Sequence, residues 1–197
     1  MTSEDLYRSY TCLPEQLLQQ PRLVHLRLPE AARRLEEAGR QYLGSAFQWL
    51  PEYTKVAEWL TDNHGRGLLC YGSCGRGKSL LCCRLIPHFI YAQHRLLVKA
   101  VPARALGPVA GQLRRSRILC VDDIGTEQPY MDYGQRRDVF PELMDEAERA
   151  GQLILATTNL SAQQLLERYG ERTLDRMRGT MISVRFFGES LRRAWKG

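Results

Sequence analysis

A short glycine-rich stretch carries the strongest chemical signal in this sequence. Its residues match the pattern GxxxxGK[ST] and read Gly72-Ser73-Cys74-Gly75-Arg76-Gly77-Lys78-Ser79. The glycines let the backbone curl so that successive N–H groups point at one phosphate, and a helix beginning after the loop adds about half a positive charge there. The apolar run 68–71 precedes the stretch, as a strand should precede a phosphate-binding loop. Residues 72–79 are therefore predicted to bind a nucleoside triphosphate.

The last two residues of the pattern have separate expected roles. Lys78 should bridge the β- and γ-phosphates, and the Ser79 hydroxyl should occupy a coordination position of Mg²⁺. The sequence contains no NKxD-type motif that would read a guanine base. ATP and Mg²⁺ are therefore the predicted ligands.

Two adjacent carboxylates, Asp122 and Asp123, follow the apolar run 118–121. At the end of a buried strand, Asp122 would hold Mg²⁺ through its water shell, and Asp123 would orient or deprotonate the attacking water. Such a pair can also begin a loop or cap a helix, but the upstream phosphate-binding loop favours the catalytic interpretation. Many ATPases carry Glu at the second position, and Asp is one methylene shorter, so we expect slow turnover.

Polar residues also follow the apolar run 153–156, and they end with Asn159. Because the carboxyl ends of parallel strands meet on the ligand side of a sheet, Asn159 is expected near the attacking water or the γ-phosphate. A turn-forming Asn ahead of a helix cap at Ser161 is the alternative. The residue type alone does not decide between them.

Short apolar runs alternate with segments of helical spacing along the chain. The runs predicted as strands are 68–71, 96–98, 118–121, 153–156 and 182–184. This alternation predicts an α/β fold with a five-stranded parallel sheet and helices on both faces. One helix should begin at Lys78 and kink near Pro87, which cannot donate a helical hydrogen bond.

Another helix is predicted over 162–169. Ser161 and Gln164 have the spacing of a capping box at its start, and Gly170 is placed to end it.

Apolar residues at helical spacing over 28–43 and again over 53–60 predict two amphipathic helices before the loop. The region before about residue 60 is short for an independent core. We therefore expect a helical N-terminal extension over 1–44 and a nucleotide-binding domain over 45–197.

Composition narrows the class of protein. The net charge is +6, and no apolar run approaches the roughly 18 residues that a membrane span needs. The N-terminus lacks a basic region followed by an apolar one, so a cytoplasmic protein without a membrane partner is expected. The cysteines lie mostly in apolar runs without zinc-ligand spacing, which predicts reduced core thiols.

The segments GSCGRGKS, CVDDIG, ATTNL and YGERTLDRMRG, in that order, resemble the AAA+ ATPases of the DnaC/IstB type. These are helicase loaders of bacterial and phage replication and the ATP-binding helpers of transposases. The resemblance covers roughly residues 45–197. It implies a P-loop NTPase fold of the AAA+ kind, here with a reduced or absent C-terminal lid.

The resemblance also implies roles for single residues. Asn159 corresponds to sensor 1, Arg176 to an arginine finger offered to a neighbouring subunit's ATP, and Arg192 to sensor 2. The substitutes for these arginines are Arg172, Arg178 and Arg193. Because a finger of this kind contributes about 10³–10⁵ to the hydrolysis rate, efficient hydrolysis should require self-association through the ATP sites.

The function implied is that of a helicase loader. Residues 1–44 would hold the replicative DNA helicase, and the AAA+ domain would bind ATP, self-associate and engage single-stranded DNA, with hydrolysis releasing the partner. Three alternatives stay open: an ATPase regulating a transposase on double-stranded DNA, a non-hydrolysing ATP-binding adaptor, and a P-loop kinase for a small substrate.

The segment expected to contact DNA is short in this sequence. The stretch 100–117, between the second predicted strand and the carboxylates, is shorter than the family's usual segment, whose helices touch single-stranded DNA. Residues that could still contact phosphates or stack on bases are Arg114, Arg115, Arg117, Tyr130, Met131 and Tyr133.

Overall fold

The central element is a five-stranded parallel sheet. The computed structural model describes residues 22–132 and 134–192, and the strand order is β2-β3-β6-β1-β7. Its strands are β1 (Gly67–Gly72), β2 (Val98–Pro102), β3 (Ile118–Asp122), β6 (Leu153–Thr158) and β7 (Met181–Phe186). All neighbouring pairs are parallel. The predicted α/β sheet is confirmed.

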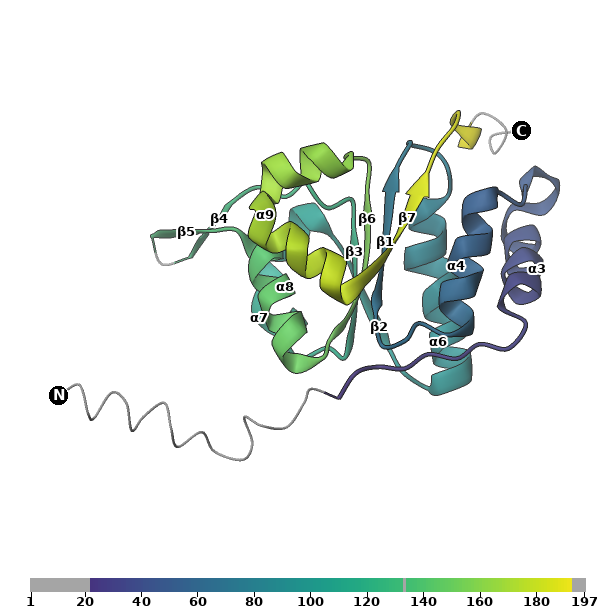
Figure 1. The fold of residues 1–197 in the computed structure, drawn as a ribbon, viewed down its shortest axis with the longest axis horizontal. Coiled ribbons are helices and arrows are strands. Elements are labelled where there is room, and N and C mark those ends of the chain that lie inside the picture. The colour runs from purple at the N-terminus through teal and green to yellow at the C-terminus, as the bar shows by residue number, and fades with distance from the viewer. Residues whose placement is uncertain (1–21, 133, 193–197) are drawn as a thin grey trace.

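Helices cover both faces of the sheet (Figure 1). They are α3 (Ala31–Leu43), α4 (Pro51–Thr61), α5 (Lys78–Leu80), α6 (Ile86–His94), α7 (Leu106–Leu113), α8 (Val139–Ala150) and α9 (Ala162–Thr180), with short turns η1 (Gly44–Ala46) and η3 (Ala103–Ala105). The helices α4 and α6 lie on one face with α3 outside them, and α7, α8 and α9 lie on the other. None of the described helices could span a membrane.

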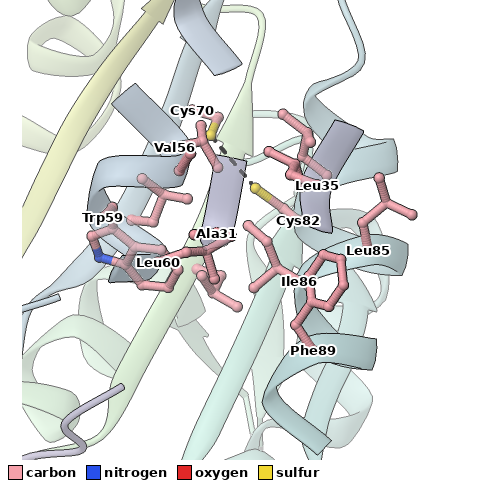
Figure 2. Packing of buried hydrophobic residues seen from close by; sticks show 14 of the residues in the cluster. Ala31, Leu35, Val56, Trp59, Leu60, Cys70, Cys82, Leu85, Ile86 and Phe89 are labelled. Carbon is pink, nitrogen blue, oxygen red and sulfur yellow. Dashed lines mark hydrogen bonds between the residues drawn. The ribbon is translucent and has the colours of Figure 1, made fainter. Parts of the chain in front are cut away.

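Alternate residues of the buried strands supply the two cores. Leu68 and Cys70 of β1 belong to the core under α3, α4 and α6 (Figure 2), whereas Leu69 belongs to the core under α7, α8 and α9. The central strands β1, β3 and β6 are apolar over most of their length because both of their faces are buried. Apolar burial on both sides therefore fixes β1, and with it the start of the glycine-rich loop.

The second strand begins later than predicted. We expected a strand over 96–98, but β2 starts at Val98. The preceding helix α6 ends at Arg95 in a left-handed conformation with φ 56°, so the next residues are needed to turn the chain back to the sheet. Leu97 in this connection is 77% exposed, which shows that its apolar character does not mark a core strand.

The helix after the glycine-rich loop is irregular, as expected from its proline. A π-helical segment, η2 (Leu81–Leu85), joins α5 to α6 just before Pro87. Proline removes one backbone donor from the helix, and a wider turn tolerates that loss.

The capping box of α9 is confirmed, and its first helical segment ends at Gly170 as predicted. Ser161 Oγ accepts a hydrogen bond from the Gln164 backbone N–H at 3.2 Å, and the Gln164 side chain accepts one from Ser161 N at 2.8 Å. Gly170 leaves the helical conformation at φ 76° and ψ 165°, yet the helix resumes and continues to Thr180. The arginine-rich stretch therefore lies on the second, kinked part of α9.

A two-stranded antiparallel hairpin, which the sequence did not predict, follows the carboxylates. It consists of β4 (Tyr130–Asp132) and β5 (Gln135–Arg137). Figure 1 shows it projecting from the body of the domain beside α8 and α9.

The N-terminal helices share a core with the sheet. Leu35 of α3 lies in the same buried cluster as Leu68 of β1. The buried side chain of Asn63 also ties the segment before α3 to the turn before β1, since it accepts from Leu26 N at 2.8 Å and donates to Val24 O at 3.0 Å. The described part of the expected extension is thus packed onto the central sheet, and the boundary at residue 44 stays a prediction.

A glycine in α3 provides a test of this packing. A Cβ atom on Gly39 would lie 2.1 Å from the Phe47 ring. Replacing a mid-helix glycine by alanine normally stabilises by up to about 1 kcal/mol, but Gly39→Ala should lower the free energy of unfolding by about 1–3 kcal/mol because the ring must move. Urea denaturation would measure both this variant and Gly111→Ala, whose added methyl meets no atom within 4 Å. Stabilisation by both changes would contradict the packing of Phe47.

Candidate active site

The glycine-rich loop is held in a conformation that needs its glycines. Gly72, Gly75 and Gly77 have φ values of 110°, 73° and 88°, which favour glycine. Space is also limited, because a Cβ on Gly72 would lie 2.3 Å from Phe186 O and one on Gly75 would lie 2.0 Å from Ser190 Oγ. The loop therefore curls tightly between β1 and the start of α5.

Most of the predicted site residues meet at one small cavity of about 80 Å³. The residues that line it are Cys74, Gly75, Gly77, Lys78, Ser79, Leu80, Asp123, Asn159 and Arg192. Gly72 and Ser73 adjoin it through their carbonyl oxygens, which accept hydrogen bonds from Lys78. The residues lining the cavity belong to the loop and helix after β1, or follow the ends of β3, β6 and β7. The carboxyl ends of these parallel strands therefore meet on this side of the sheet.

Lys78 is the most constrained cation at this cavity. It is 5% exposed, and its Nζ donates to Gly72 O at 2.9 Å, Ser73 O at 2.7 Å and Asn159 Oδ1 at 2.9 Å. Burial lowers the pKa of the ammonium group below its usual range. Its positive charge is thus placed where anionic phosphate oxygens would be better partners than neutral carbonyls.

Asn159 connects the cation to a carboxylate. Its Oδ1 accepts from Lys78, and its Nδ2 donates to Asp123 Oδ1 at 3.1 Å. Asp123 has φ 58°, a left-handed conformation that Asp and Asn tolerate better than most residues. The chain Lys78–Asn159–Asp123 therefore fixes which way the amide and the carboxylate face.

Thr157 is a site residue that sequence reasoning missed. Its hydroxyl donates to Asp122 Oδ1 at 2.6 Å and accepts from Asp123 N at 2.9 Å. This fully buried side chain on β6 thus holds the Asp122 carboxylate and the backbone at Asp123. The only signal in the sequence was its place in the quoted segment ATTNL, since a threonine in a strand usually serves packing.

Thr157→Val should reduce ATP turnover by about 10- to 100-fold, because it releases the Asp122 carboxylate and the backbone at Asp123 from their positions. The free energy of unfolding should fall by about 1–3 kcal/mol. Thr158→Val is a matched control, since its hydroxyl also makes two hydrogen bonds, to Ile124 O and from Leu160 N, but none to the carboxylates. Steady-state ATPase assays and urea denaturation of both variants would separate the effects. Equal turnover in the two variants would refute the positioning role of Thr157.

The segment after β7 closes one side of the site. Leu191 N donates to Gly75 O at 3.0 Å, which holds residues 187–192 against the loop and brings Arg192 to the cavity. This is the described chain after β7, and it contains no lid domain.

Two predicted residues lie apart from the cavity. The Arg76 side chain turns away from it and pairs with Glu52 of α4 at 2.8 Å. Arg176 is bound to α8, with Asp145 at 2.8 Å and Glu148 at 2.9 Å, and its side chain is 19% exposed.

Of the three arginines that could substitute for Arg176 or Arg192, two lie within the described residues. Arg172 is 3.8 Å from Asp145 with 80% of its side chain exposed, and Arg178 pairs with Glu171 at 3.0 Å. Arg193 lies outside the described residues.

The residues considered for DNA contact differ in their surroundings. Arg114 pairs with Glu142 at 3.2 Å, and Tyr130 packs against Gly107 of α7. Arg115, Arg117 and Met131 are exposed. Tyr133 lies outside the described residues.

No protein-family model matches the sequence, and no curated protein matches it either. Solved structures do match. The DnaC helicase loader is 17% identical with a TM-score of 0.53, over 82% of this chain and 93% of that chain. DnaI is 18% identical with a TM-score of 0.53, over 91% and 94%. Domain III of the replication initiation protein DnaA from Thermotoga maritima is 17% identical with a TM-score of 0.55, over 78% and 72%.

The chain has the AAA+ fold. At these identities the likeness concerns the fold alone, and it agrees with the family resemblance of the sequence segments. In this AAA+ fold the glycine-rich loop follows β1, the two carboxylates follow β3, and Asn159 follows β6. The site segments therefore follow one another along the chain and converge at one cavity.

Proposed function

We propose that this chain is a Mg²⁺-dependent ATPase of the helicase-loader type. The observation that carries the proposal is the hydrogen-bonded chain from Lys78 through Asn159 to Asp123, beside the glycine-rich loop. A cation for phosphates and a carboxylate for water, held a short distance apart by one amide, are the groups that phosphoryl transfer to water requires.

The donors present fit Mg²⁺. Ser79 lines the cavity, and Asp122 ends β3, which is separated from β1 by β6. A hydroxyl and a carboxylate are therefore available, and Mg²⁺ prefers few protein oxygens together with water and phosphate. When bound, Mg²⁺ would neutralise charge on the phosphate oxygens. Thr157 holds the Asp122 carboxylate in place for this role.

The protein groups around the phosphates would then act in sequence. Lys78 would exchange its carbonyl and amide partners for phosphate oxygens, which frees Asn159 to contact the γ-phosphate or the attacking water. Asp123 would orient that water and accept its proton at a carboxylate oxygen.

Self-association would complete the site. Arg176, Arg172 and Arg178 all lie on the second part of α9, and none lines the chain's own cavity, which suits a residue that acts on a neighbour. For Arg176 this action requires release from Asp145 and Glu148.

The proposal also includes two binding partners. It assigns residues 1–44 to the replicative helicase and the AAA+ domain to single-stranded DNA. Support comes from the family resemblance and from the fold shared with the DnaC helicase loader. The transposase-regulating alternative predicts a preference for double-stranded over single-stranded DNA, and the adaptor alternative predicts no turnover in the assembled state.

The experiment is ATP hydrolysis as a function of protein concentration, with and without single-stranded DNA and replicative helicase. For wild type, turnover per subunit should rise with concentration and respond to DNA or helicase. Arg176→Ala should abolish this rise while ATP binding persists. Glu148→Gln is the matched control, because it removes one of the two ion pairs of Arg176 and leaves the arginine in place.

The outcomes separate the alternatives. Turnover that is independent of concentration and unchanged in Arg176→Ala would show that one subunit suffices and would refute trans action. ATP binding without turnover at any concentration would favour the adaptor.

A further inference from the structure

A buried ion pair lies inside the phosphate-binding loop. Arg76 stands between two glycines, and its guanidinium donates from Nε to Glu52 Oε1 at 3.0 Å, with Nη2 at 2.8 Å from the same oxygen. The side chains are 11% and 0% exposed. The motif leaves position 76 open to any residue, so this pair is a property of this chain and not of the motif.

Arg76 also contacts two other parts of the structure. Its carbonyl oxygen accepts a hydrogen bond from Tyr53 OH at 3.1 Å. Its Nη1 lies 3.5 Å from Glu189 O, and a Cβ on Gly188 would be 3.3 Å from the same nitrogen. Through this one residue, α4, the glycine-rich loop and the segment carrying Arg192 are joined.

Stability alone is a poor reason for this pair. Burial of two charges costs about as much as their attraction returns, and apolar residues of similar volume often do as well. Within the described chain, the second carboxylate oxygen of Glu52 is buried and has no hydrogen-bond partner, which adds a further cost. A role in positioning explains why a charged pair is placed at the loop.

The loop itself explains what needs positioning. Gly75 and Gly77 flank Arg76 and have positive φ values, and glycine loses more conformational freedom on ordering than any other residue. A loop that is ordered before the ligand arrives does not pay this cost on binding, and affinity rises accordingly. Arg76 is the side chain at the middle of the loop, so its anchoring restricts the glycines on both sides.

We propose that Arg76 is a positioning residue, anchored by Glu52, that holds the loop ready for phosphate. This inference rests on the proposed nucleotide binding and adds a link to the N-terminal helices, since Glu52 belongs to α4 and α4 packs on α3. Displacement of α3 and α4 by a partner would loosen the loop, and bound nucleotide would in turn oppose that displacement.

The test uses the full chain and a fluorescent ATP analogue. In Arg76→Leu combined with Glu52→Leu, both charges are removed together, so the fold is retained. The Kd should rise about tenfold or more. In steady-state ATPase assays, KM should rise and kcat should change much less, because the anchored loop serves binding and does not contact the reacting atoms. The urea midpoint without nucleotide should be unchanged.

Two further variants keep the result interpretable. Val56→Ala, a core substitution on the same helix (Figure 2), should lower the urea midpoint without changing the Kd. Arg76→Lys retains a positive charge that can pair with Glu52, but it lacks the guanidinium that contacts both Glu52 and the carbonyl oxygen of Glu189. This variant should show an intermediate Kd even if the double variant does not fold.

The results distinguish failure of this inference from failure of the proposed function. If wild type binds ATP and the folded double variant or Arg76→Lys binds it equally well, Arg76 has no positioning role. A rise in Kd for Val56→Ala as large as that for the double variant would also overturn the inference. If wild type itself does not bind the analogue, the proposed function fails first.

Discussion

Lys78→Met is expected to weaken ATP binding by about 10²–10⁴-fold, because two charge-assisted hydrogen bonds of about 1.5–3 kcal/mol each are lost. In the free protein the ammonium is surrounded by the loop carbonyls and Asn159. These neutral oxygens position the charge, and the binding energy is realised only when phosphates replace them.

The stability of the nucleotide-free protein should not decrease in Lys78→Met. Burial lowers the pKa of Lys78, which means that the folded free protein holds the charged form at a cost. Methionine keeps the buried stem and removes that cost, so the free energy of unfolding without nucleotide should not fall. Isothermal titration with an ATP analogue and urea denaturation would measure both quantities.

Lys99→Met is the control for this prediction, since Lys99 is exposed on β2 away from the cavity. Its ATP affinity should equal that of wild type. If Lys78→Met binds ATP as tightly as this control, the glycine-rich loop does not bind phosphate in the manner proposed.

Asp123→Asn is expected to reduce hydrolysis of bound ATP by about 10²–10⁴-fold, the contribution typical of a general base. Binding should be little affected, because in the proposed mechanism this carboxylate acts on the attacking water and not on the phosphates. The substitution is well matched, since asparagine tolerates the positive φ of this position. It also retains an oxygen that can accept from Asn159.

Single-turnover measurements at saturating ATP would isolate the chemical step from binding. Asp138→Asn, a substitution at the exposed residue before α8, serves as the control for loss of one negative charge. A fast chemical step in Asp123→Asn would move the base function to another group and weaken the proposed mechanism.

The sheet and the convergence of the candidate site residues were predictable because their signals are local. Each buried strand is a short apolar run, and each ligand-side residue directly follows such a run. Once the strands are parallel, their carboxyl ends must meet, which brings Asp123 and Asn159 to the loop. The capping box at Ser161 was likewise readable from two residues three positions apart.

The parts that sequence reasoning missed depend on contacts between distant segments. Nothing near Arg76 in the sequence indicates that Glu52 would draw it away from the phosphates. The ion pairs of Arg176 with α8 arise from tertiary packing in the same way. So do the hydrogen bonds of the Thr157 hydroxyl with the Asp122 carboxylate and the Asp123 backbone. Gly170 was expected to end a helix because its φ preference is local, whereas the packing that restarts the helix is not.

The position of β1 in the sheet has a consequence for how the protein is made. This strand carries the glycine-rich loop, yet both of its neighbours, β6 and β7, come from the far end of the described chain. During synthesis β1 has no strand partner until β6 emerges, because Leu68 pairs with Leu155, and contacts of such long sequence separation slow folding. The proposed nucleotide site therefore assembles late, after most of the polypeptide has emerged.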